Sequence, residues 1–112
     1  MSKYRSNPCV IDSIRFASQK EGKRYQELLL LQKAKKICNL KLQPKFLIEI
    51  NGKKICTYIA DFEYDRILTA SFSKNGGFLE RICEDCKGFK TPIYRLKKKL
   101  MNAVYGIIIT ET

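Results

Sequence analysis

The sequence predicts a single-domain α+β protein whose elements follow the order α-β-β-β-α-β. Two segments with helical spacing of their apolar residues each begin at a capping residue. An Asn-Gly pair separates two stretches rich in β-branched and aromatic residues, as expected for a hairpin. The 112 residues are 45% hydrophobic and 29% charged, which suits one folded domain with one hydrophobic core.

The first helix is expected from Ser18 to about Lys36. Ser18 and Glu21, three residues apart, match a capping box. Tyr25, Leu28, Leu29 and Gln32 lie along one stripe of this helix, and the apolar residues Tyr25, Leu28 and Leu29 are expected to face the core. Leu30 and Leu31 exceed what one core-facing stripe needs, which leaves a surplus apolar face on this helix. Before the helix, residues 1–9 are expected to be a flexible basic arm, and residues 10–16 a short extended or irregular segment.

Three strands are expected in the middle of the chain. Residues 45–50 and 53–64 form the first two, joined by Asn51-Gly52, because both turn positions require positive φ. Residues 66–77 are expected to be a loop or distorted hairpin. They lead to a third strand over residues 78–87, which Gly88 ends.

A second helix begins after Thr91, with Pro92 at its first position, and stops at Gly106. Its apolar stripe, which we expect to face the core, consists of Ile93, Leu96, Leu100, Ala103 and Val104. Residues 107–110 follow as a short and wholly apolar strand, which we expect to be buried.

The charge balance indicates the kind of partner. Lysine and arginine number 22 against 11 acidic residues, a net charge of +11. Such an excess on a small domain favours a polyanionic partner, either nucleic acid or an anionic membrane surface. The first eight residues are polar and basic, and the longest apolar run is residues 28–31, so we expect a cytoplasmic protein that does not cross a membrane.

The cysteine and histidine content narrows the chemistry. Five cysteines, an odd number without a secretion signal, are expected to be free thiols. The spacing of Cys83 and Cys86 suggests zinc, but a structural zinc site needs four ligands and the chain has no second pair. Because histidine is absent, any catalysis must use carboxylates, lysines or a metal held by oxygen.

Three charged residues of the predicted strands, Asp61, Asp85 and Lys87, are candidates for a catalytic site. Asp61 interrupts an apolar stretch, which is costly unless the carboxylate is paired or binds metal. Asp85 and Lys87 lie two apart, so they project from one face of the third strand beside Gly88. Asp61 and Asp85 could hold Mg²⁺, Lys87 could position the attacking water, and Glu21 could hold a metal-bound water.

Simpler interpretations compete with this one. Asp-x-Lys occurs often by chance, and Asp85 and Lys87 could be a solvated pair on an exposed strand. Glu21 already has a structural role as the capping-box partner of Ser18.

Taken together, these residues resemble the PD-(D/E)XK nuclease superfamily, and in particular its small Holliday-junction resolvases and phage endonucleases. The segments that carry the likeness are residues 11–16 with Ser18 and Glu21, 24–25, 42–44, 58–62, 84–88, 91–92 and 94–97. The resemblance implies a restriction-endonuclease-like αβββαβ core over residues 1–112. It also implies a Mg²⁺- or Mn²⁺-dependent endodeoxyribonuclease, phage- or prophage-encoded, that acts on branched DNA such as Holliday junctions. The resemblance further implies a homodimer, in which the surplus apolar face of the first helix could serve.

The resemblance also implies residue roles. Asp61 and Asp85 would be metal ligands together with the main-chain carbonyl of Cys86, Lys87 the catalytic lysine and Glu21 the helix acid. Two departures stand out: Ala60 replaces the proline of the superfamily's name, and Glu84 lies beside Asp85 as a second candidate ligand. Asp85 is favoured because it shares a face with Lys87.

DNA contacts are expected from basic and aromatic residues near the hairpin turn and on the second helix: Lys53, Lys54, Tyr94, Arg95, Lys97 and Lys98. Two other functions remain open. One is a non-catalytic basic nucleic-acid-binding module on the same fold, and the other is a phage protein–protein adaptor whose charge serves solubility.

Overall fold

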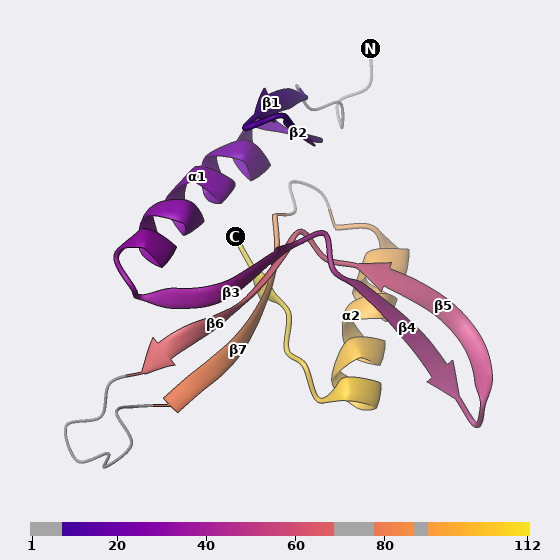
Figure 1. Ribbon diagram of the computed structural model, residues 1–112. Coiled ribbons are helices and arrows are strands. Elements are labelled where there is room, and N and C mark those ends of the chain that lie inside the picture. The colour runs from indigo at the N-terminus through magenta and orange to yellow at the C-terminus, as the bar shows by residue number, and fades with distance from the viewer. Residues whose placement is uncertain (1–7, 69–77, 87–89) are drawn as a thin grey trace.

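The computed structural model describes residues 8–68, 78–86 and 90–112 (Figure 1). Within these ranges the chain forms two helices and eight strands. In order they are β1 (Cys9–Ile11), β2 (Ile14–Phe16), α1 (Gln19–Lys33), β3 (Ile37–Leu42), β4 (Lys45–Ile50), β5 (Lys53–Ile59), β6 (Phe62–Leu68), β7 (Phe78–Asp85), α2 (Pro92–Tyr105) and β8 (Thr110–Glu111). The fold is therefore mixed α+β, as the sequence predicts.

One four-stranded sheet organises the molecule, with strand order β3-β6-β7-β8. β3, β6 and β7 are antiparallel, and β8 runs parallel to β7. The chain passes through α2 between these two parallel strands, as parallel neighbours require a crossover. When the β1–β2 and β4–β5 hairpins are left out, the remaining elements follow the predicted order α-β-β-β-α-β.

The strands that make up this order differ from the predicted ones. β3 was not predicted, and the predicted strand over residues 53–64 is two strands in different sheets, β5 and β6. The chain turns at Ala60 and Asp61, where the Ala60 N–H donates to the Pro44 carbonyl (3.1 Å) and the Gln43 N–H donates to the Asp61 carbonyl (2.9 Å). These two bonds tie the ends of the β4–β5 hairpin, which projects away from the main sheet (Figure 1). Apolar alternation continues through the turn, so the pattern could not locate it.

The turn residues explain both hairpins. Asn51 and Gly52 have φ of 53° and 75°, which confirms the predicted turn between β4 and β5. Asp12 and Ser13 have φ of 53° and 66°, so residues predicted as extended or irregular form the tight β1–β2 hairpin. Cys9, assigned to the flexible arm, belongs to β1, and residues 1–7 lie outside the described ranges.

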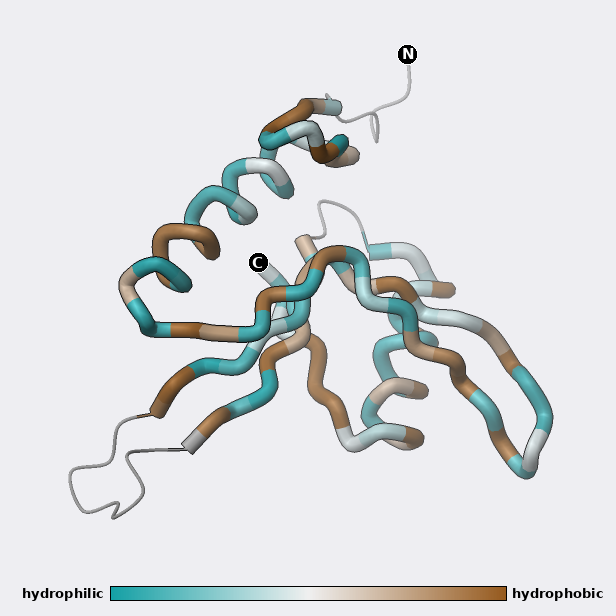
Figure 2. Tube along the Cα trace, viewed as in Figure 1, coloured by the Kyte–Doolittle hydropathy of each residue, from teal (hydrophilic) through white to brown (hydrophobic). Residues whose placement is uncertain are grey.

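α1 begins as predicted and ends earlier. Ser18 is its N-cap, with the Oγ atom accepting from the Glu21 N–H at 3.1 Å. The helix stops at Lys33 because Lys35 adopts φ of 62°, three residues before the predicted end. Tyr25 and Leu28 are buried, whereas Leu30 is 67% exposed. Figure 2 shows the hydrophobic residues of α1 gathered in its C-terminal half.

α2 has the predicted caps, Thr91 and Gly106, but buries a different face. Tyr94 and Met101 are buried, whereas Ile93 and Leu96 are 67% and 58% exposed. Of the predicted core-facing stripe, only Leu100 packs partly into the core, while Ala103 and Val104 are exposed. The helix is oriented by the contacts of Tyr94 and Met101, which outweigh the direction of its apolar stripe. No helix within the described ranges has the length and apolarity needed to cross a membrane.

The last strand is also displaced from its predicted position. β8 consists of Thr110 and Glu111, not residues 107–110. Ile109 is buried, but Ile108 is 74% exposed, so the apolar run is not wholly buried. The strand lies where its backbone pairs with β7, with Thr110 opposite Glu84 and Glu111 opposite Asp85.

Two buried clusters replace the single expected core. One lies beneath α1 and contains Phe16, Tyr25, Leu28, Ile37, Phe62 and Tyr64. The other joins α2, the β4–β5 hairpin and the sheet, and contains Phe46, Ile48, Tyr58, Ala60, Cys83, Tyr94, Met101 and Ile109. Successive residues of β7 enter different clusters: Ile82 packs on the cluster beneath α1 and Cys83 belongs to the other. The sheet therefore has an apolar region on each face.

Candidate active site

Asp61 and Asp85 lie side by side at one end of the main sheet. Phe62 of β6 is paired with Glu84 of β7. Because the strands are antiparallel, Asp61 just before Phe62 and Asp85 just after Glu84 come next to each other. The Asp61 N–H donates to the Glu84 carbonyl at 3.1 Å, which extends the pairing to this end of the strands. Cβ atoms of opposed residues in an antiparallel pair are about 5 Å apart, so the ladder brings the two carboxylates together.

The surroundings of this pair are largely buried. Asp85 has no exposed surface and accepts a hydrogen bond from the Tyr58 hydroxyl of β5. The Oδ2 atom of Asp61 accepts from the Cys86 N–H at 2.7 Å. Burial, with Asp85 and then Glu21 nearby, raises the pKa of Asp61 to about 7, although the Cys86 N–H opposes that rise. The pair thus retains a proton up to near-neutral pH.

Glu21 joins this group from α1. Its side chain is only 5% exposed, although it lies in the first turn of a helix, where glutamate is usually solvated. Its charge contributes to the raised pKa values of both Asp61 and Cys86. The structure therefore brings together three of the sequence-predicted site residues: Glu21, Asp61 and Asp85.

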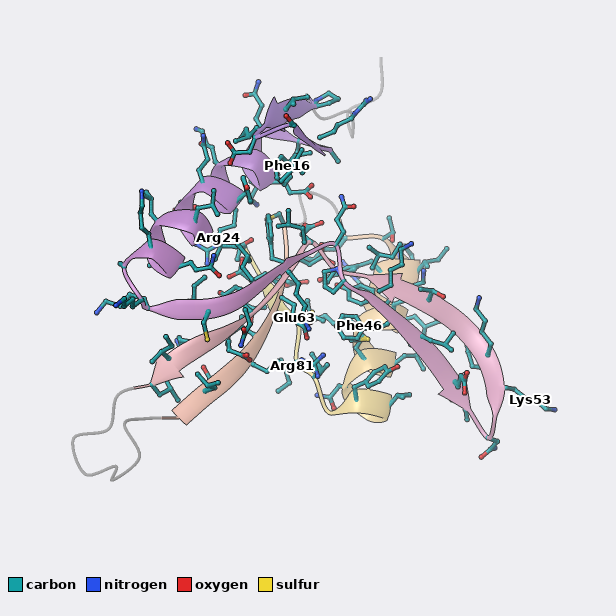
Figure 3. The ribbon with its side chains drawn as sticks, in the orientation of Figure 1. Phe16, Arg24, Phe46, Lys53, Glu63 and Arg81 are labelled. Carbon is teal, nitrogen blue, oxygen red and sulfur yellow. The ribbon has the colours of Figure 1, made fainter. Side chains whose placement is uncertain are left out.

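Glu84, the alternative ligand, faces the other side of the sheet. Its carboxylate accepts from Arg24 of α1, at 2.8 Å from Nε and 2.6 Å from Nη2, and from the Tyr64 hydroxyl. Figure 3 shows Arg24 extending from α1 toward the sheet. Glu84 is 1% exposed and committed to this ion pair, which leaves Asp85 as the acid beside Asp61.

Two predicted site features, the Lys87 side chain and the main-chain carbonyl of Cys86, stay predictions. Lys87 lies outside the described residues, as does Gly88. Cys86 is described: its thiol packs at the cluster beneath α1 and lies 3.0 Å from the Thr112 hydroxyl. Within the described ranges, no group of three or more Asp, Glu, Cys or His side chains is arranged to hold a metal ion. The predicted ligand set is thus represented by the carboxylates of Asp61 and Asp85.

Glu111 is a polar residue of this region that the sequence analysis did not select. It is opposite Asp85 in the parallel β7–β8 pair, so the two side chains share a face. Its carboxylate accepts from the Tyr94 hydroxyl at 2.8 Å and pairs with Lys90 and Lys98 at 3.1 and 3.3 Å. The Tyr94 hydroxyl, and then the two lysines, lower the pKa of Glu111 to about 2.

The predicted DNA-binding residues fall into two places. Lys53 and Lys54 are exposed at the tip of the β4–β5 hairpin, where Lys53 points away from the molecule (Figure 3). On α2, Arg95 is exposed, while the Lys97 Nζ atom donates to the Thr57 carbonyl at 3.1 Å. The remaining two, Tyr94 and Lys98, are engaged with Glu111.

Sequence reasoning missed the supporting residues Tyr58 and Glu111. Tyr58 occupies an inward position of a strand and could equally pack as an aromatic core residue. Glu111 follows an apolar run near the chain's end, and only the register of β8 brings it beside Asp85. A pairing that depends on β7 and β8 meeting in parallel leaves no local signal in the sequence.

Chemically, this end of the sheet offers a pair of carboxylates, the half-buried Asp61 and the buried Asp85, in a protein rich in lysine and arginine. No curated protein and no solved structure matches the chain. A family model matches over residues 1–110. The chain therefore belongs to the family described as "Protein of unknown function (DUF1064)".

Proposed function

We propose that this protein is a Mg²⁺- or Mn²⁺-dependent endodeoxyribonuclease that hydrolyses DNA phosphodiester bonds. The observation that carries the proposal is the proximity of Asp61, just before β6, and Asp85, at the end of β7, with Glu21 close to them. Two like charges that lie opposite each other in a sheet and away from solvent destabilise the fold. A divalent cation bound by both carboxylates would offset this cost, because such ions bind carboxylates that lie together.

The donor chemistry of the residues fits such a cation. Asp61 and Asp85 are oxygen donors, and the pKa of Asp61 is raised by burial and by the nearby charges of Asp85 and Glu21. Mg²⁺ prefers one or two carboxylates, with its remaining positions left to water and phosphate. When bound, such an ion polarises a phosphate oxygen and lowers the pKa of water.

The protein's own residues would orient this pair. The Tyr58 hydroxyl holds one oxygen of Asp85, and the Cys86 N–H holds one oxygen of Asp61, so both carboxylates are fixed before substrate arrives. Cys86 remains the proposed main-chain ligand through its carbonyl. Lys87, two residues after Asp85, remains the proposed catalytic lysine, and Glu21 the acid that holds water beside the pair.

The charge of the chain supports a DNA substrate. A net charge of +11 provides the phosphate contacts that dominate nucleic-acid affinity. We further propose branched DNA such as Holliday junctions as the substrate, a homodimer as the active form, and a phage or prophage origin with action in the host cytoplasm. These four points rest on the resemblance set out from the sequence.

The test is cleavage of a four-way junction and a linear duplex in Mg²⁺, Mn²⁺ or EDTA. The wild type is expected to cut in the presence of metal, and Asp85→Asn to lose activity by about 100-fold or more, since a metal ligand is removed. Asp65→Asn is a matched control, because Asp65 lies on the neighbouring strand β6 and accepts a hydrogen bond from the Asn39 side chain at the surface, at 2.9 Å. Equal activity in the Asp85 and Asp65 variants would refute the catalytic assignment.

The second candidate is a non-catalytic nucleic-acid-binding module on the same fold. The observation that favours it is that the described residues contain no ready arrangement of three metal-binding side chains. This alternative predicts DNA binding that is salt-dependent and unaffected by Asp85→Asn, with no cutting in either metal.

A further inference from the structure

A groove between α2 and β8 has a composition that the proposed cleavage chemistry does not explain. Its volume is about 510 Å³, and it is lined by Lys90, Arg95, Lys98, Lys99, Asn102, Ile108, Ile109 and Glu111. Four cationic side chains and one acid therefore surround a pair of isoleucines. Contacts to phosphates alone would require the cationic side chains but not the two isoleucines.

The cationic wall follows one face of α2. Arg95, Lys99 and Asn102 are four and three residues apart, so they line up along the helix over about 10 Å. Lys90 and Lys98 are paired with Glu111, whereas Arg95 and Lys99 form no ion pair within the part of the chain that the structure describes. Both remain available for an anionic ligand.

The other wall is apolar. Ile108 lines the groove and is 74% exposed, so its side chain is open to solvent and to a ligand. Ile109 beside it is buried and closes the floor. A ligand that fills this groove therefore needs spaced negative charges on one side and apolar groups on the other.

The position of the groove connects it to the carboxylate pair. Glu111 lines the groove and is opposite Asp85 across the β7–β8 ladder. Neighbouring strands are about 4.8 Å apart, so a chain that leaves the groove at Glu111 reaches the strand that carries Asp85.

We propose that the α2–β8 groove binds a single-stranded DNA segment next to the bond that is cleaved. Its phosphates contact Arg95 and Lys99, and its unstacked bases lie against Ile108. A duplex keeps its bases stacked inside and would leave the apolar wall uncovered, whereas a single strand presents both phosphates and base faces. The inference rests on the proposed function and narrows its substrate to DNA with a single-stranded arm.

The test measures binding in EDTA, where no cutting occurs, by fluorescence anisotropy with oligo(dT) and with a blunt duplex. Arg95→Gln/Lys99→Gln is expected to weaken oligo(dT) binding about tenfold or more, and to reduce the slope of log Kd against log salt by about 1.4. Ile108→Ser is expected to weaken oligo(dT) binding about threefold with the salt slope unchanged, because no charge is lost, and to leave duplex binding unaltered.

The matched control is Lys33→Gln/Lys36→Gln, which removes the same charge from exposed positions at the end of α1. The proposal is overturned if this control loses as much oligo(dT) affinity as the groove variant. It is also overturned if Ile108→Ser weakens duplex and oligo(dT) binding equally. All five substituted residues are exposed, so the variants are expected to fold.

The groove and the nuclease assignment can fail separately. Binding of oligo(dT) that depends on the groove, without cutting of any substrate in Mn²⁺, supports the groove and refutes the nuclease. Asp85-dependent cutting by a groove variant with unchanged oligo(dT) affinity refutes the groove and supports the nuclease.

Discussion

At the scale of single residues, the adjacent acids Glu84 and Asp85 have opposite physical situations. Glu84 is buried with a bidentate arginine and a tyrosine hydroxyl, so its charge is compensated. Asp85 is buried beside a second carboxylate, Asp61, whose pKa its charge raises, and it accepts from the Tyr58 hydroxyl. Strand alternation alone separates them, because successive side chains of β7 face opposite sides of the sheet.

This difference predicts opposite effects on stability for two isosteric substitutions. Glu84→Gln is expected to lower the free energy of unfolding by roughly 3 kcal/mol, because it breaks the buried ion pair with Arg24 and leaves that guanidinium with the exposed Glu27 carboxylate at 3.8 Å. Asp85→Asn is expected to raise it by about 1–2 kcal/mol at pH 8 without metal, because repulsion with Asp61 is removed. Urea unfolding of both variants in EDTA tests this prediction, and equal destabilisation by the two substitutions would contradict it.

At the scale of elements, α2 separates the effect of caps from the effect of hydrophobic pattern. Thr91, Pro92 and Gly106 act through the backbone of their own helix, so its ends were predicted correctly. The face that packs is determined by the hairpin and by β8, which meet the helix through Tyr94 and Met101. The sequence of α2 carries no information about these neighbours, and the apolar stripe pointed elsewhere.

The orientation of α2 can be tested by unfolding. Met101 is fully buried, so Met101→Ala is expected to cost about 2–5 kcal/mol. Leu96→Gln is expected to change the stability by less than about 0.5 kcal/mol, because Leu96 is 58% exposed. A large loss at Leu96 with a small one at Met101, measured by urea unfolding, would mean that the helix packs with the opposite face.

The strands show the same division between local and distant information. The Asn51-Gly52 turn was predictable because its φ requirement belongs to those two residues. β3 was missed because it is short, begins just after α1 and contains the exposed polar residues Asn39 and Lys41. Its place in the sheet depends on pairing with β6, which lies far along the chain. Asp61 was selected from its charge within an apolar stretch, yet its partnership with Asp85 required the register of β6 and β7.

At the scale of the whole molecule, the carboxylate pair links proton binding, metal binding and folding. The pKa of Asp61 is raised from 3.8 to about 7, so the folded protein holds a proton that the unfolded chain has released. The associated stability is fully present below about pH 4 and is lost as the pH rises through 7. Without metal, this pair therefore makes the protein less stable at pH 8 than at pH 5.5.

A bound divalent cation should reverse this trend. Saturating Mn²⁺ is expected to raise the Tm by roughly 5 °C or more at pH 8, and by less at pH 5.5, where the proton competes for the same oxygens. Thermal unfolding at both pH values, with Asp85→Asn as the comparison, tests this. Shifts of the same size at both pH values, or in the variant, would show that Mn²⁺ binds elsewhere.

The two hydrogen bonds that close the base of the β4–β5 hairpin have a consequence for how such chains can vary. Gln43, Pro44, Ala60 and Asp61 hold the ends of the hairpin together, and residues 49–55 beyond the packed part are all exposed. Residue pairs can be added to or removed from that outer half without moving Asp61, because insertions at exposed tips leave the closed base intact. The distance between the lysines at the tip of the hairpin and the acids at its base can therefore change. The hairpin can become longer or shorter while Asp61 and Asp85 keep their positions.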